Sequence, residues 1–282
     1  GGQHSHLRDG LSKSLRRRLV DPEPQPLGVY DRWIVTDKDT GGKVMVEFRQ
    51  RDALTSLRLV EKVYDHPSLA RIILLEDLPK LSHVTILSEP LLGKSVGGEC
   101  LDGPFAPALA TRIIAEVLRG VQYLHDHDIA HRYISADEIV FQTAGRSGHV
   151  KLLASNFHER FSPGTPFTDP VAASYIYSAP EILRKQPQGL GVDVWAIGVV
   201  FHLMLVQYFP FAPDHVSDDP ETDREDKEIV AKVLRKEPEF LAQYFSAVPP
   251  EVIAAIQACL SKDASQRPTA ARVLSLPAFK DL

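Results

Sequence analysis

A chain of 282 residues, of which 44% are hydrophobic and 24% charged, has the composition of a globular protein with room for one large domain or two lobes. The formal net charge of −5 excludes a general electrostatic attraction to nucleic acid or to an anionic membrane surface, so neither is an expected partner. Two cysteines, Cys100 and Cys259, cannot form a disulfide framework and have no metal-ligand spacing, which favours an intracellular, cytoplasmic location.

The N-terminal residues 1–26 combine a basic run (Lys13, Arg16, Arg17 and Arg18) with the proline-rich stretch DPEPQP. This composition predicts a flexible extension, and an arm that docks on an acidic surface is the alternative. The first residues, GGQHSH, are polar and do not resemble a signal peptide.

Residues 27–90 are predicted to form a small, largely antiparallel sheet with one helix. The turn DKDTGG, rich in Asp and Gly, separates two strand-like runs and is a hairpin signal. Pro67 is expected to end the helix. The predicted strands are residues 29–35, 43–48, 70–76 and 83–89, and the predicted helix is residues 53–64.

Residues 91–282 are predicted to be largely helical, because apolar residues recur at helical spacing from residue 109 to residue 124 and in several segments downstream. The longest apolar run, residues 194–206, is too short to span a bilayer and contains His202, so it predicts a buried helix and no membrane span. The fold class is therefore predicted to be α+β, with a small β-rich lobe followed by a large helical lobe. The strand-like segments of the second lobe are residues 138–141 and 149–153.

Ordered motifs in the second half of the chain resemble those of the protein kinase catalytic domain. APE is present as Ala179-Pro180-Glu181, and DVWAIG, which begins at Asp193 and includes Trp195, is similar to the family's DxWSxG. The closing segment, residues 261–279, has Arg267 at the position of the arginine that pairs with the APE glutamate. The resemblance implies that Asp193 accepts hydrogen bonds from the catalytic-loop backbone and that Glu181 pairs with Arg267.

The resemblance covers residues 27–282 and implies a bilobal kinase-like fold. It implies a β-rich N-lobe over residues 27–90 and a helical C-lobe over residues 91–282. Residues 223–245 further resemble the calcium/calmodulin-dependent kinase group.

Kinases position the nucleotide phosphates with a glycine-rich loop, a lysine and a helix glutamate, and this sequence departs from the family at each part. Only Gly28 precedes the first hairpin, and the lysine position carries Glu47, whose charge would repel phosphates. Lys43 lies four residues earlier, on the same face of the predicted strand, and is an alternative source of the cation. The helix glutamate position carries Leu57, with Glu61 one turn further on.

The family's catalytic loop, HRDLKPEN, corresponds to HRYISADE starting at His131. Tyr133 replaces the base aspartate, and a phenol with an ordinary pKa of about 10 is a poor base at neutral pH. Ser135 replaces the lysine and Glu138 replaces the magnesium-binding asparagine, whereas Asp137 matches the family's glutamate.

The DFG motif corresponds to Ala154-Ser155-Asn156, so the principal magnesium ligand is replaced by a methyl group. Loss of a general base alone lowers the rate by about 10²–10⁴, and here the lysine, the metal ligand and the glycines are missing as well. We therefore expect a pseudokinase, a catalytically inactive kinase homologue that uses no metal and no cofactor.

The expected function is that of a scaffold or allosteric regulator of a protein partner, either an active kinase or its substrate. Two alternatives remain open. One is a switch that binds ATP weakly and without metal, and the other is an atypical serine/threonine kinase that relies on Lys43 and Glu138.

Arg132 remains in the HRY sequence, and in many kinases this arginine contacts a phosphate on the activation segment. Ser162 and Thr165 each precede a proline and are candidate phosphorylation sites for a proline-directed kinase. The alternative is that Arg132 caps local carbonyl groups beside a proline-rich loop.

The acidic run at residues 217–226 is either a partner-docking loop or a solvated insertion. His125, His127 and His131 cluster in the sequence, but their spacing matches no zinc motif, so no metal site is expected.

Overall fold

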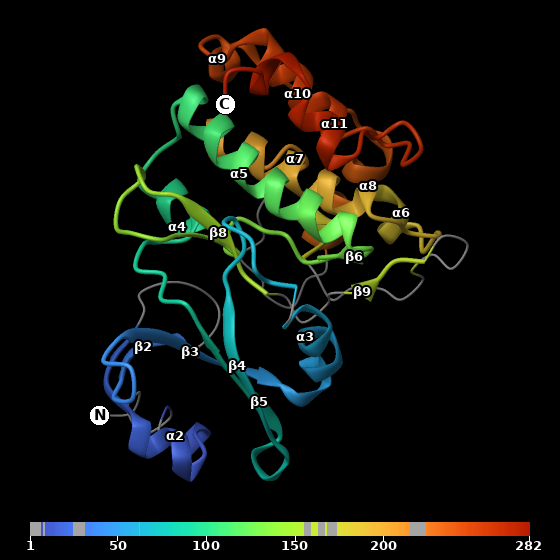
Figure 1. Ribbon diagram of the computed structural model, residues 1–282. Helices are drawn as coiled ribbons and strands as arrows, with labels where there is room; N and C mark the ends of the chain where they lie inside the picture. The colour runs from blue at the N-terminus through green and yellow to red at the C-terminus, as the bar shows by residue number, and fades with distance from the viewer. Residues whose placement is uncertain are drawn as a thin grey trace. The chain divides into compact units, whose positions relative to one another are not determined.

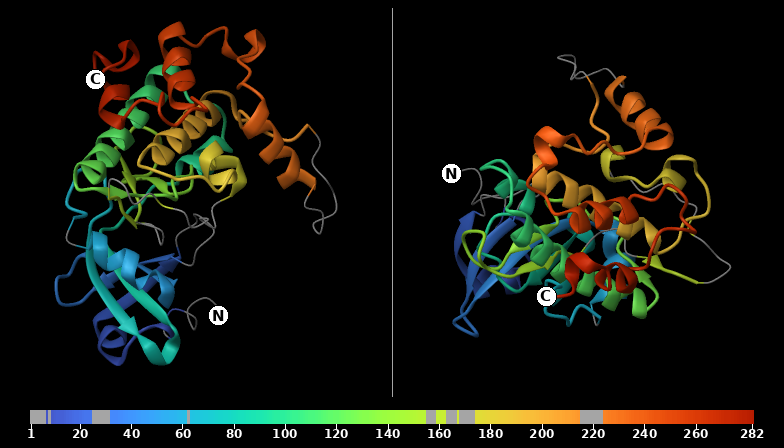
Figure 2. Two further views of the ribbon diagram at one scale, coloured as in Figure 1. Left: turned by 90° about the vertical axis from the view of Figure 1, so that its right-hand side faces the viewer. Right: turned by 90° about the horizontal axis from the view of Figure 1, so that it is seen from above.

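The computed structural model describes residues 7, 9–24, 32–61, 63–154, 159–162, 167, 174–214 and 224–282. The chain divides into two compact units. The first comprises residues 1–99 and 137–158, and the second comprises residues 100–136 and 159–282. The elements of each unit can be followed by their colour from the N-terminus to the C-terminus in Figures 1 and 2.

The first unit is built on an antiparallel sheet of five strands in the order β1-β2-β3-β5-β4 (Figure 1). Side chains alternate between the faces of β3, so Val44 and Val46 lie on one face while Met45 and Glu47 lie on the other. The strands are β1 (Leu19–Pro24), β2 (Arg32–Asp37), β3 (Lys43–Gln50), β4 (Ile72–Leu78) and β5 (His83–Ser88). The helical segments that follow β1 up to residue 100 are η1 (Arg51–Ala53), α3 (Leu54–Val60), η2 (Pro79–Leu81) and α4 (Val96–Cys100).

A second hairpin, β7 (Ile139–Phe141) and β8 (Val150–Leu152), belongs to the first unit. The Ala70 N–H donates to the Leu152 carbonyl at 2.9 Å, and the Leu92 N–H donates to the Gln142 carbonyl at 3.0 Å. The predicted boundary between the lobes, after residue 90, therefore differs from the observed division of the chain. Residues 91–99 and 137–158 belong to the same unit as the sheet.

The N-terminal residues form helix α2 (Lys13–Arg18) and strand β1, which pairs with β2. Ser12 caps the helix by accepting the Leu15 N–H at 3.3 Å. The prediction of a flexible extension over residues 1–26 is therefore wrong for residues 13–24, because regularly spaced leucines outweigh the polar composition around them. These leucines recur every four residues and are buried in one cluster with side chains of β2, β3 and β5: Leu7, Leu11, Leu15 and Leu19.

Two arginines of the basic run make ordered contacts, Arg18 with the sheet and Arg16 within the N-terminal segment. Arg18 makes a forked ion pair with Asp37 at the end of β2, with Nε–Oδ1 and Nη2–Oδ2 distances of 2.7 and 2.6 Å. The hydrogen bonds from Arg18 keep the pKa of Asp37 well below its ordinary value. Arg16 donates to the carbonyls of Leu11 and Asp9 at 2.8 and 3.1 Å. These contacts do not favour the alternative of an acidic-surface arm.

The second unit is arranged around α7 (Gly191–Val206), in which every residue from Val192 to Leu205 is buried. Helices α5 and α10 pack on α7, and α11 packs on α5 (Figure 1). Gly198 permits the approach of α10, because a Cβ at this position would lie 2.7 Å from the Cβ of Cys259. The elements of this unit are α5 (Pro107–Asp126), β6 (Ile129–Ala130), β9 (Glu159–Arg160), η3 (Tyr175–Tyr177), α6 (Pro180–Leu183), α7, α8 (Arg224–Arg235), α9 (Ala242–Phe245), α10 (Pro250–Cys259), α11 (Ala270–Leu274) and η4 (Pro277–Phe279).

The predicted fold class is confirmed, since a β-rich unit and a helical unit together make an α+β protein. The prediction of a buried helix over residues 194–206 is also confirmed. Among the helices in the described part of the chain, none is long and apolar enough to cross a membrane.

Candidate functional site

Asp193, in the first turn of α7, organises the loop that follows β6. Its Oδ2 accepts the His131 N–H and lies beside Nε2 of His125, both at 2.9 Å, while its Oδ1 accepts the Arg132 N–H at 2.8 Å. Burial alone would raise the pKa of Asp193, but the contact with His125 and the nearby His131 hold it below its ordinary value. The backbone contacts that the kinase resemblance implied for Asp193 are present.

Glu181 and Arg267 form a buried, forked ion pair that joins α6 to the segment before α11. Their Oε1–Nη1 and Oε2–Nη2 distances are 2.6 and 3.0 Å, and Arg267 also donates to the Gly191 carbonyl at 2.9 Å. The guanidinium of Arg267 lies 5.2 Å from the Trp195 ring, which stacks on Phe211 at 5.6 Å. The second implied contact is therefore also present, and it connects three segments of the helical unit.

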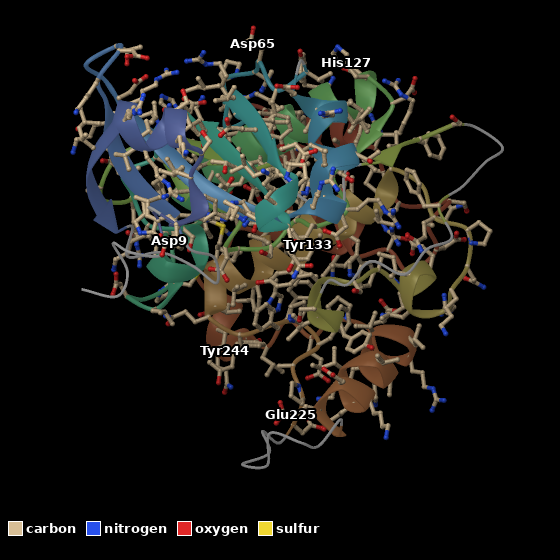
Figure 3. The ribbon with its side chains drawn as sticks, turned by 90° about the horizontal axis from the view of Figure 1, so that it is seen from below. Asp9, Asp65, His127, Tyr133, Glu225 and Tyr244 are labelled. Carbon is tan, nitrogen blue, oxygen red and sulfur yellow. The ribbon has the colours of Figure 1, made fainter. Side chains whose placement is uncertain are left out.

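The loop after β6 carries Tyr133 and Ser135, both half-buried (Figure 3 labels Tyr133). The Tyr133 N–H donates to Nδ1 of His131 at 3.3 Å, so the loop closes on its own histidine. Asp137, further along the chain, accepts a hydrogen bond from the Ser95 hydroxyl at 3.0 Å within the first unit. A phenol and a hydroxyl therefore occupy the two positions at which the family has its base and its lysine.

In the first unit, Glu47 of β3 lies between two arginines. Arg32, opposite Glu47 in the register of β2 and β3, approaches its Oε2 with Nε at 3.1 Å, and Arg49 approaches the same oxygen with Nη2 at 3.1 Å. Each of the three side chains is only 3% exposed. Where the family places a lysine for the phosphates, this chain has a buried carboxylate already engaged by two internal cations.

Glu138 adds a second carboxylate to this cluster. Its Oε1 lies 3.7 Å from Nη2 of Arg32, and its buried Oε2 makes no hydrogen bond with the described residues. Burial raises the pKa of Glu138 in spite of the opposing attraction of Arg32 and Arg49. We refer to Arg32, Glu47, Arg49 and Glu138 together as the buried charge cluster.

The alternative cation, Lys43, is exposed and lies at the start of β3 opposite Thr36, beside the hairpin turn. This placement argues against Lys43 as a substitute for the missing lysine, because the strand rises by about 3.3 Å per residue between it and the buried Glu47. Leu57, at the position of the helix glutamate, is fully buried in α3, an environment that suits an apolar side chain. Glu61 is exposed.

A magnesium–nucleotide complex needs oxygen ligands for the metal and cations for the phosphates. Ala154, at the position of the DFG aspartate, is buried and offers no side-chain ligand. Glu138 keeps one carboxylate oxygen near Arg32, and the described residues contain no group of three side chains able to hold a metal ion. At Ala154 and Glu47, the described positions of the metal ligand and of the phosphate-binding lysine, the side chains therefore lack the oxygen ligand and the cation that this complex needs.

Several predicted positions lie outside the described residues: Gly28, Ser155, Asn156, Thr165 and residues 217–223 of the acidic run. Ser162 is described and exposed. His127 is exposed and contacts the Tyr123 carbonyl through Nδ1 at 2.8 Å, whereas His125 contacts Asp193.

The sequence did not reveal four residues of these sites: Arg32 and Arg49, which pair with Glu47, and Phe167 and Gln188, which contact the side chain of Arg132. Arg49 could have been found, because residues two apart in a strand share a face. Arg32, Phe167 and Gln188 reach their partners through pairings that strand alternation alone does not reveal.

A sheet-based unit and a helical unit that carries the Asp193 and Glu181–Arg267 contacts define a protein of the kinase-like class. Comparison with family models agrees, since the model described as the protein kinase domain matches residues 38–279. The chain belongs to the protein kinase domain family.

Several relatives are calcium/calmodulin-dependent kinases, which confirms the predicted likeness to that group. The chain is 27% identical over 286 residues to calcium/calmodulin-dependent protein kinase cmkA of Emericella nidulans, covering 96% of this chain and 65% of the relative. It is 26% identical over 265 residues to calcium/calmodulin-dependent protein kinase type 1 of Macrobrachium nipponense, covering 92% and 70%. It is also 26% identical to the CaM kinase-like vesicle-associated protein of Danio rerio, covering 80% of this chain and 50% of that protein. The chain thus spans 50–70% of the length of these three relatives.

Proposed function

We propose that this protein is a catalytically inactive kinase homologue that acts as a scaffold or allosteric regulator of protein partners. The observation that carries the proposal is the buried pairing of Glu47 with Arg32 and Arg49. A lysine at this position would orient the phosphates of ATP, whereas Glu47 directs its charge to residues of its own sheet.

The chemistry of the other positions supports the same proposal. Tyr133 is a poor base, and Ala154 has no ligand for a metal. Parts that act as a unit do not contribute additively, so restoring one of them is not expected to restore transfer of phosphate. The proposed partner is an active kinase or a kinase substrate, met in the cytoplasm, where two free and buried cysteines would remain reduced.

The first test is thermal unfolding of the full chain with ATP, ADP or adenosine, each with and without Mg²⁺ or Mn²⁺. A ligand at about 100 times its dissociation constant would stabilise the fold by roughly 2.7 kcal/mol, and we expect no stabilisation by any of them. A calcium/calmodulin-dependent kinase measured in parallel provides the positive control.

A shift that needs no metal would replace the scaffold proposal with a nucleotide-responsive switch. A metal-dependent shift accompanied by transfer of the γ-phosphate to a protein substrate would replace it with an atypical kinase. The partner is sought by affinity capture of the native chain, with the destabilised Arg267→Ala chain as the control for surfaces that depend on the fold. Recovery of the native chain alone would contradict the scaffold proposal.

A further inference from the structure

Arg132 combines an unusual backbone conformation with a buried side chain. Its φ is 63°, in the left-handed region that residues other than glycine seldom adopt, and its N–H is held by Asp193 at 2.8 Å. The residue is only 9% exposed, and a charged group at such a site needs partners to replace water.

Two such partners are Phe167 and Gln188. The guanidinium carbon of Arg132 lies 4.7 Å from the centroid of the Phe167 ring, and Nη2 donates to Oε1 of Gln188 at 3.3 Å. Phe167 and Gln188 are themselves buried. A cation over an aromatic face is attracted more strongly when both groups are removed from water, so this contact is well placed to be effective.

The backbones of Phe167 and Gln188 are paired as well. The Phe167 N–H donates to the Gln188 carbonyl at 3.1 Å, and the Gln188 N–H donates back at 3.0 Å. The ring of Phe161 meets Phe167 edge-on at 5.9 Å, while the Phe161 N–H donates to the Asp128 carbonyl at 2.6 Å. Side-chain and backbone contacts therefore fix the same described residues of the activation segment, which runs from residue 158 to residue 177.

We propose that Phe167 acts as an aromatic anchor for the activation segment by stacking on Arg132, so that the segment is held without a phosphate. Arginine prefers a phosphate as a forked partner, but a phosphate on the segment would have to displace Phe167 and Gln188 from Arg132. Ser162 is exposed, so it is available as a competing site. This inference goes beyond the proposed function and does not depend on whether nucleotide binds.

The test is hydrogen–deuterium exchange at single-residue resolution on the full chain, after phosphatase treatment and confirmation of the unphosphorylated mass. We expect the amides of Phe167 and Gln188 to be protected in the native chain. Phe167→Leu keeps an apolar side chain but removes the ring, and it should exchange about tenfold faster at both amides, because a desolvated cation–π contact changes an opening equilibrium by about that factor.

Phe161→Leu is the matched control, because it removes a ring that touches Phe167 and leaves the stacking on Arg132 in place. It should preserve most of the protection. Amides of α7 report whether each variant is folded. If the α7 amides lose their protection in Phe167→Leu, that variant is unfolded, and exchange at Phe167 and Gln188 is compared between the native chain and Arg132→Lys instead. Arg132→Lys keeps the charge and loses the planar group.

Two results would overturn the anchor. One is an unphosphorylated native chain whose Phe167 and Gln188 amides are unprotected until Ser162 is phosphorylated. The other is a Phe167→Leu chain as protected as the native one. In the otherwise native chain, Ser162→Glu should leave the protection of the Phe167 and Gln188 amides unchanged. If Ser162→Glu restores that protection in the Phe167→Leu chain, the result would favour a phosphorylation switch over the anchor.

Discussion

Glu47 is the residue on which the charge balance of the first unit depends. It is the shared partner of Arg32 and Arg49, and all three side chains are removed from water. Deleting one partner of a buried ion pair leaves the other charge buried without compensation. The resulting loss of stability is much larger than the net stabilisation that the intact pair provides. The stability of the sheet should therefore respond strongly to a change at Glu47.

We expect Glu47→Ala to lower the free energy of unfolding by about 3–5 kcal/mol, since it leaves the buried Arg32 and Arg49 with Glu138, whose ionisation burial opposes, as the remaining carboxylate of the buried charge cluster. Urea unfolding at constant pH measures the change. The control is Asp77→Ala, which breaks the exposed pair with Arg51 and should have little effect. Equal losses in the two variants would contradict a special role for the buried carboxylate.

Glu138 should make the stability depend on pH. Burial raises its folded-state pKa above the ordinary value of 4.5, so its protonated form is favoured in the fold. The resulting stabilisation is complete below the unfolded-state pKa and is lost as pH rises through the folded-state pKa.

Glu138→Gln carries no such charge, so it should be more stable than the native chain at pH 8, with the difference shrinking towards pH 5. Unfolding in urea across this range tests the prediction, and the exposed Glu61→Gln should show no comparable trend. A native chain that gains stability relative to Glu138→Gln as pH rises would show the opposite sign and refute it.

At the scale of elements, α2 and β1 show that a polar terminal segment can belong to a core. Leucines at every fourth position of this segment are buried against the sheet, while the basic residues between them face outward, bind backbone carbonyls or, at Arg18, pair with Asp37. At Gly10 a Cβ would collide with the Phe48 ring, and the Gly10 carbonyl contacts Nε2 of His83 in β5 at 2.7 Å. The segment is fitted closely to the sheet that it covers.

We expect Leu15→Ala to destabilise the protein by about 2–5 kcal/mol, because it removes a fully enclosed side chain from this cluster. Arg17→Ala, on the exposed side of the same helix, should leave the urea midpoint unchanged. If both variants unfold at the native midpoint, α2 contributes no stability in solution.

Some of these elements were predictable from the sequence and others were not. Motif order and spacing were sufficient for Asp193, Glu181 and Arg267, because each lies in a recognisable local pattern. The N-terminal helix was missed because charges and prolines dominate the composition of its neighbourhood and obscure a narrow apolar stripe.

Contacts of the candidate site that depend on pairing between segments were missed for a different reason. Arg32 meets Glu47 only through the register of the β2–β3 hairpin, and Phe167 meets Arg132 through its pairing with Gln188. Strand alternation specifies the face on which a side chain lies and leaves its partner on the neighbouring strand undefined.

At the scale of the whole molecule, each unit contains one of the two tryptophans. Trp33 lies in the leucine cluster of the first unit, and Trp195 lies in α7 beside Arg267. Both are buried, so their fluorescence reports the packing of the two units separately.

We expect Arg267→Ala to lower the unfolding midpoint seen by Trp195 more than the midpoint seen by Trp33, because it leaves the buried Glu181 unpaired within the second unit. The measurement uses Trp33→Phe and Trp195→Phe backgrounds, each with one remaining reporter. Glu47→Ala should produce the reverse order. Identical shifts at both tryptophans in both variants would mean that the units unfold as one.

The placement of β1 and β2 has a practical consequence for any shortened version of this protein. The match to the protein kinase domain begins at residue 38, after both strands have ended. A fragment cut at that residue would turn β3 from an inner strand into an edge strand with unpaired backbone groups. Its apolar Val44 and Val46 would lose the leucines that cover them, so such a fragment would tend to associate with copies of itself along that edge.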